Sequence, residues 1–127
     1  MKRLTAQWVR KAEDDTRGAT SLAQSEPPLN DLICFHCQQS AEKYLKAILQ
    51  EWDRVPPRIH DLLQLLNLLL PRDATLRTLR RKLASLRNYA VDYRYPGDHA
   101  SRKQSLAALR HAEKVRHEIR TRLGLPP

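Results

Sequence analysis

The stretch from Leu29 to Asp53 constrains the fold more than any other part of the chain. Its apolar residues recur at spacings of three and four, the period that places side chains on one face of an α-helix. They are Leu29, Ile33, Cys37, Ala41, Tyr44, Leu45, Ile48 and Trp52. Polar residues lie along or beside this stripe at His36, Gln39, Ser40, Glu42, Lys43 and Lys46. We therefore expect a long helix with a polar edge, bounded by Pro27-Pro28 and Pro56-Pro57.

The same period continues along the chain and predicts four further helices. The expected segments are residues 3–24, 62–70, about 74–95 and about 101–123. The fourth has the most regular pattern and should end near Tyr95-Pro96-Gly97, with Leu76, Leu79, Leu83, Leu86, Ala90 and Tyr93 on one seam. A chain of 127 residues fits one domain, and short connections favour antiparallel neighbours. The predicted fold is all-α: one domain over residues 1–127, an antiparallel bundle with a four-helix up-and-down core and one short helix.

Four polar residues stand where the predicted helices must accommodate them. Asp15 falls on the apolar stripe of the first helix, where a carboxylate is costly unless it is paired. We expect an Arg, Lys or Tyr from another helix beside it, or a position at the rim in water. His60 is expected to act as an N-terminal cap or a hinge for the helix over 62–70, with Asp61 in its first turn. Asp73 is predicted to cap the next helix.

Several classes of protein do not fit the composition. No apolar run approaches the length of about 18 residues that a membrane helix needs, and we expect a cytoplasmic protein. Cys34 and Cys37 stand one helical turn apart without a second ligand pair, which indicates two small helix thiols rather than a zinc site. The sequence has no glycine-rich phosphate loop, His-Glu-x-x-His or Gly-x-Ser-x-Gly motif. We predict no metal and no cofactor.

The positive charge is concentrated in one half of the chain. Residues 1–70 carry nine Lys or Arg and nine Asp or Glu, whereas residues 71–127 carry fourteen and five, which accounts for the whole net charge of +9. A basic half beside a neutral half suggests an anionic partner, such as a nucleic acid, a nucleotide or an acidic protein surface. A soluble, arginine-rich helical surface would give the same count.

A second polar stretch runs from Arg87 to Gly97. It places guanidinium, amide, carboxylate and phenol groups within about two helical turns, at Arg87, Asn88, Asp92, Tyr93, Arg94 and Tyr95. An arginine fork suits a phosphate, and tyrosine can stack on a base. The same groups equally suit a helix end that fastens itself to a neighbour. We expect this stretch and the polar edge of the long helix to meet in one pocket.

Three motifs resemble the HEPN domain family. They are the run Cys34–Lys43 followed by Leu45-Lys46-Ala47, the triplet His60-Asp61-Leu62, and Tyr93-Arg94-Tyr95-Pro96. The resemblance covers about Trp8 to Leu123. It implies an antiparallel helical bundle that pairs into a homodimer, and a link to nucleotides or RNA. It also implies that the chain could be a partner of a small nucleotidyltransferase in a toxin–antitoxin or two-component pair.

Other members that this chain resembles are metal-independent ribonucleases, in which four to six residues separate an Arg from a following His. Here Arg87 and Asn88 match the beginning of that signature. The positions where the histidine would stand hold Asp92, Tyr93 and Arg94. An imidazole can move protons near neutral pH, whereas an ordinary tyrosine or aspartate cannot readily do so. A catalytic histidine would have to come from elsewhere in the fold, and His36 and His99 are the candidates.

We therefore predict a non-catalytic module that binds a nucleotide or RNA phosphate. The expected ligand-binding residues are His36, Gln39, Lys43, Lys46, Arg87, Asn88, Tyr93, Arg94 and Tyr95. Two alternatives remain open. One is a toxin-like endoribonuclease that uses Arg87 with Asn88 and an unrecognised base, and the other is a dimeric scaffold whose polar cluster is only structural.

Overall fold

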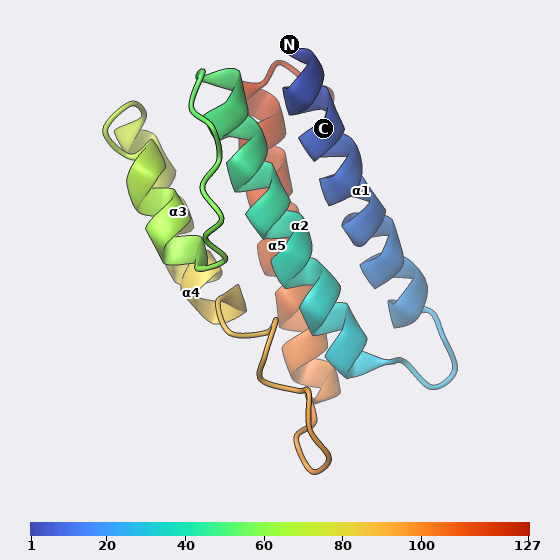
Figure 1. Ribbon diagram of the computed structural model, residues 1–127. Helices are drawn as coiled ribbons and strands as arrows, with labels where there is room; N and C mark the ends of the chain where they lie inside the picture. Colours follow the sequence, from blue (N-terminus) through green and yellow to red (C-terminus); the bar gives the residue numbers. More distant parts are fainter.

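Two long helices, α1 (Arg3–Ala23) and α2 (Asn30–Glu51), run antiparallel in the computed structural model, which describes residues 1–127 (Figure 1). The turn between them contains Pro27 and Pro28, as the predicted helix boundary requires. Both helices agree with the predicted segments to within two residues. α2 is the central element of the bundle, because it contacts α1, α3, α4 and α5.

The remaining helices are α3 (Leu62–Leu69), the 3₁₀ helix η1 (Ala74–Leu79), α4 (Arg80–Leu86) and α5 (Arg102–Arg122). In Figure 1, α1, α2, the η1–α4 segment and α5 alternate in direction, and α3 is the short additional helix. No strand is present, so the prediction of an all-α bundle is confirmed. No helix has both the length and the apolar character to cross a membrane.

The predicted fourth helix is shorter than its apolar pattern indicated. Its leucine seam is fully buried, but the α-helix ends at Leu86 and turns follow from Arg87. Within these turns the Val91 and Asp92 amides both donate to the Asn88 carbonyl at 3.0 Å. Successive turns also bring residues three or four apart to the same side. The spacing of Ala90 and Tyr93 therefore did not distinguish turns from helix.

The core is built from 25 buried apolar residues contributed by all the helices. Tyr44, in the middle of α2, is completely buried. Cys34 and Cys37 are also buried, and burial raises the pKa of the two thiols to about 11 and about 12. Both cysteines therefore behave as small apolar side chains and not as nucleophiles.

Side-chain caps fix three of the helix starts. Asp73 accepts from the Thr75 amide at the start of η1, as predicted. Ser101 and Gln104 form a capping box at the start of α5. The expectation that His60 caps α3 is wrong, because Asp61 is the cap and accepts from the amides of Leu63 and Gln64. A carboxylate accepts these N–H groups better than an imidazole can, which leaves His60 for another contact.

Candidate functional site

The polar edge of α2 divides into two parts, and the first part faces α1. Lys43 Nζ lies 2.5 Å from Asp15 Oδ2, and His36 Nδ1 lies 2.8 Å from Asp15 Oδ1. Asp15 is buried, with 8% of its surface exposed. The expectation that this carboxylate meets a basic group from another helix is therefore confirmed. Lys43 pairs with Asp15 and His36 hydrogen-bonds to it, although each keeps part of its side chain in solvent.

The second part of the edge faces the segment that precedes α3. Gln38, Glu42 and Lys46 follow one another at successive helical turns, and all three are buried. Lys46 Nζ lies 3.2 Å from Glu42 Oε2, and Gln38 Nε2 donates to Glu42 Oε1 at 3.3 Å. Gln39 donates to the Gln38 side-chain oxygen at 2.6 Å. This row is a connected network, and the ring of Trp8 covers the Lys46 ammonium at 5.7 Å.

His60 extends this network from α2 to the surface. Its Nδ1 lies 3.1 Å from Glu42 Oε2, and its carbonyl accepts from Gln38 Nε2 at 3.4 Å. The Glu42 side chain is 6% exposed, whereas the His60 side chain is 75% exposed. A buried carboxylate thus holds one nitrogen of a solvent-exposed imidazole.

Arg87 reaches the same region through the next residue along the chain. Its Nε and Nη2 donate to Asp61 Oδ2 at 2.8 and 2.5 Å. Partial burial would raise the pKa of Asp61, but Arg87 and the Leu63 and Gln64 amides outweigh that effect and hold it below its ordinary value. His60 and Asp61 are consecutive, so contacts lead from Lys46 on α2 to Arg87 at the end of α4.

The other predicted residues of the 87–97 segment lie apart from the α2 network. Tyr93 packs against the core with its ring 5.7 Å from that of Tyr89. Burial, with the nearby Cys34 and Asp92, raises the pKa of Tyr93. Asn88, Arg94 and Tyr95 are exposed, and Arg94 donates only to the Ala90 carbonyl, four residues earlier. Within one chain the two stretches therefore do not form a single pocket: Arg87 joins the edge of α2, whereas Asn88, Arg94 and Tyr95 occupy an exposed turn.

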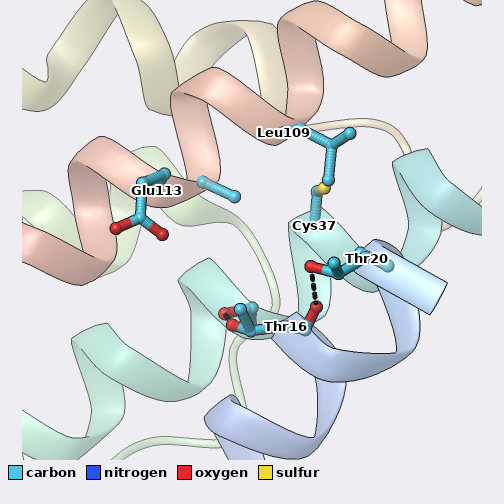
Figure 2. Close-up of a pocket in the computed structure, with 8 residues that line it drawn as sticks. Thr16, Thr20, Cys37, Leu109 and Glu113 are labelled. Carbon is cyan, nitrogen blue, oxygen red and sulfur yellow. Dashed lines mark hydrogen bonds between the residues drawn. The ribbon is translucent and has the colours of Figure 1, made fainter. Parts of the chain in front are cut away.

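A cavity of about 220 Å³ lies between α1, α2 and α5, and none of the predicted ligand-binding residues lines it (Figure 2). Its lining combines small apolar groups with hydroxyls, and the hydroxyls of Thr16 and Ser40 bond to each other at 2.8 Å. The full lining is Thr16, Ala19, Thr20, Cys37, Ser40, Leu109, Ala112 and Glu113. The high pKa of Cys37 makes this cavity a poor place for nucleophilic chemistry.

The two histidines considered as substitutes for the missing signature histidine are held elsewhere. His36 contacts Asp15 between α1 and α2, and His99 Nδ1 lies 3.7 Å from Asp31 Oδ2 near the start of α2. Neither is paired with Arg87, whose ion-pair partner is Asp61. His60 is the histidine that the chain places beside that pair.

Glu42, His60 and Asp61 were absent from the predicted set of ligand-binding residues. The sequence carried a partial signal for one side of the network, because Gln38, Glu42 and Lys46 are spaced by four and therefore share a helix face. It carried no signal that the loop before α3 would fold back onto that face. That contact depends on the path of residues 52–61, which has no regular secondary structure.

Three comparisons with known proteins place this architecture. A family model described as HEPN domain matches residues 5–122. A solved structure, the crystal structure of TT1696 from Thermus thermophilus, is similar to this chain with a TM-score of 0.79 and 27% sequence identity. The similarity covers 95% of this chain and 98% of that one. The comparison with curated proteins gave no match.

Proposed function

Because the chain belongs to the HEPN domain family, we propose that it is a non-catalytic module that binds the phosphate groups of a nucleotide or of RNA. The absence of histidine at the Asp92, Tyr93 and Arg94 positions supports the non-catalytic assignment. Tyr93 cannot substitute for it near neutral pH, because its pKa is raised further from that range.

One observation carries the binding assignment: the turn after Arg87 presents unpaired recognition groups to solvent. Arg94 makes no ion pair, and its one hydrogen bond, to its own segment, uses Nε. The terminal N–H groups of its guanidinium are thus available for a phosphate. Tyr95, next to it, is 69% exposed, so its ring is open to a stacking partner. An adjacent arginine and tyrosine can hold a phosphate and stack on a base.

The charge distribution supports the same class of ligand. Residues 71–127 hold an excess of nine positive charges, fourteen minus five. This half includes the exposed turn and the outer face of α5, where Arg110 and Lys114 lie. A field of this sign attracts phosphate-bearing molecules before any specific contact forms.

We further propose that the protein acts as a homodimer and as the partner of a small nucleotidyltransferase. The outer side of α2 supports an interface, because Leu29 and Leu32 are 45% and 46% exposed and Phe35 is half-buried beside them. Apolar side chains that share a helix face suit contact with a second protein surface.

Fluorescence anisotropy with a labelled RNA ten-mer and with labelled ATP tests the binding proposal. We expect the Arg94→Ala variant to bind at least one of these probes about tenfold more weakly. Arg77→Ala is the matched control, because Arg77 is also exposed and donates only to a carbonyl of its own segment. For RNA, affinity should fall steeply with salt as counterions are released.

Three outcomes would contradict the proposal. Metal-independent cleavage of the ten-mer would favour the endoribonuclease alternative with Arg87 and Asn88. Failure of the wild-type protein to bind either probe would favour the scaffold alternative, especially if Arg87→Ala also breaks a dimer seen by analytical ultracentrifugation. Equal weakening by Arg94→Ala and Arg77→Ala would show general charge attraction and no defined site.

A further inference from the structure

We propose that His60, positioned by Glu42, binds a further phosphate group of the ligand, separate from the one held at the turn of Arg94, with the unused N–H groups of Arg87 as a second donor. This inference rests on the proposed function and gives it a site. Its central residues, His60 and Glu42, lie outside the predicted set, whereas Arg87 belongs to it. The inference follows from how the ring is held, what remains free on it, and how the surrounding charges balance.

The His60 ring is fixed through one nitrogen. Nδ1 lies 3.1 Å from Glu42 Oε2, and this carboxylate is itself fixed by Lys46 at 3.2 Å and by Gln38 at 3.3 Å. Gln38 also holds the His60 carbonyl. An ionised carboxylate only accepts hydrogen bonds, so Nδ1 must carry the proton. Glu42 therefore sets both the orientation and the tautomer of the ring.

Packing does not explain why a histidine occupies this position. Three quarters of its side chain is exposed, so the ring buries little apolar surface. With Nδ1 occupied, Nε2 is the polar atom left over on the ring. In the protonated ring Nε2 carries a hydrogen and donates to an anion. The arrangement presents Nε2 to solvent from a rigid support, and Nε2 becomes a donor to an anion when the ring takes up a second proton on binding.

Arg87 supplies the second part of the site. Asp61 occupies its Nε and Nη2, which leaves the N–H groups of Nη1 without a partner, and the side chain is 43% exposed. Asp61 follows His60 directly in the chain and holds Arg87 in place. Through Asp61, Arg87 thus offers a second cationic donor to the region of His60.

The balance of charges favours an anion despite the two carboxylates. Glu42 is paired with Lys46, and Asp61 is paired with Arg87. Each pair is neutral overall, so a protonated His60 adds one positive charge to the group. Lys43 faces Asp15 on the other side of α2 and does not compete for Glu42. A bound phosphate would restore neutrality and stabilise the protonated imidazole.

The test combines probe binding with NMR of the histidine rings in the full-length protein. We expect His60→Gln to weaken binding of the RNA ten-mer or of ATP by about tenfold to a hundredfold, as loss of a charge-assisted hydrogen bond predicts. His117→Gln, an exposed histidine on α5, is the control and should leave binding unchanged. Addition of inorganic phosphate should shift the His60 Nε2 and Cε1–H resonances more than those of His117.

Glu42→Gln tests the positioning role separately. We expect it to change the tautomer ratio of the His60 ring in ¹⁵N spectra and to weaken binding less than His60→Gln does. A Glu42 that served only to stabilise the fold would leave the tautomer ratio unchanged, and that result would overturn its assignment. Since His60 lies at the surface, its own substitution should leave the fold intact and keep the test informative.

The outcomes separate this inference from the proposed function. Suppose that the wild-type protein binds a probe and that Arg94→Ala weakens this binding whereas His60→Gln does not. The His60 site is then wrong and the proposed function stands. If neither probe binds but phosphate shifts the His60 resonances, the anion site stands and the proposed function fails. If neither probe binds and phosphate leaves His60 unmoved, both are overturned.

Discussion

Two clusters of charged residues use a glutamate in different ways. In the middle of α1, Glu13 accepts from Arg116 Nη2 at 2.8 Å and from Arg120 Nη1 at 2.9 Å, so that it links α1 to α5. Both arginine side chains are largely shielded, at 18% and 13% exposed. In the other cluster, Glu42 holds His60, which is 75% exposed. The first cluster directs its donors inward, and the second leaves a donor facing solvent.

The pKa values of the first cluster agree with a structural role. Burial would raise the pKa of Glu13, but the hydrogen bonds and charges of Arg116 and Arg120 outweigh it and hold that pKa below its ordinary value. Arg120 also donates to the buried Tyr44 hydroxyl at 3.2 Å. A carboxylate whose partners are largely shielded from solvent fastens helices together. A carboxylate that supports an exposed ring is available to prepare that ring for a ligand.

The largest expected effect comes from removing Glu42. Glu42→Ala leaves the Lys46 ammonium, whose side chain is 6% exposed, without its carboxylate. Breaking a buried pair from one side destabilises a protein by about 3–5 kcal/mol. Urea denaturation followed by circular dichroism measures this loss in the free energy of unfolding. Glu113→Ala is the control, because Glu113 is 59% exposed and its pair with Arg116 should contribute less than about 1 kcal/mol.

A loss of less than about 1 kcal/mol in Glu42→Ala would contradict this interpretation. It would mean that solvent reaches Lys46 readily and that the network supporting His60 is loose. The rigid support that the phosphate site requires would then be absent.

Removing the charge of Glu13 should lower the free energy of unfolding by a smaller amount, which depends on pH. Glu13→Gln keeps the shape of the side chain but removes its charge, and we expect a loss of about 1–3 kcal/mol at pH 7, typical of hydrogen bonds to charged groups. The pKa of Glu13 is lower in the folded chain than its ordinary value of 4.5. Its contribution is therefore fully present above about pH 4.5 and is lost as the pH falls through the folded-state value.

Urea denaturation of the wild type and of Glu13→Gln between pH 7 and pH 3 measures this dependence. The difference in unfolding free energy between the two proteins should shrink as the pH falls. A difference that stays constant over this range would show that the charge of Glu13 contributes little.

The helices were predictable because each buries a stripe of apolar residues with a regular period. The seam from Leu76 to Leu86 was correctly assigned to the core. The pattern failed after Leu86, where turns keep Tyr93 against the core without continuing the helix. Periodicity reports which side chains are buried, and it does not report which backbone conformation buries them.

The site was less predictable than the fold, because its contacts join segments distant in sequence. The pairing of Asp15 was expected from the cost of burying a charge, and it is confirmed by Lys43. The contact between Glu42 and His60 could not be expected in the same way. Helix spacing shows that Glu42 lies near Lys46, but only the path of the loop before α3 brings His60 to it.

The smallest expected effect is on the stability of His60→Ala. Its ring is mostly in solvent, and Glu42 would keep its bonds to Lys46 and Gln38 after the ring is removed. Surface substitutions of this kind change the free energy of unfolding by about 0.5 kcal/mol or less. The urea midpoint of this variant should therefore lie close to that of the wild type. A loss above about 2 kcal/mol would mean that the imidazole fastens residues 52–61 to α2. His60 would then act as Arg116 and Arg120 do, and the contrast between the two glutamates would disappear.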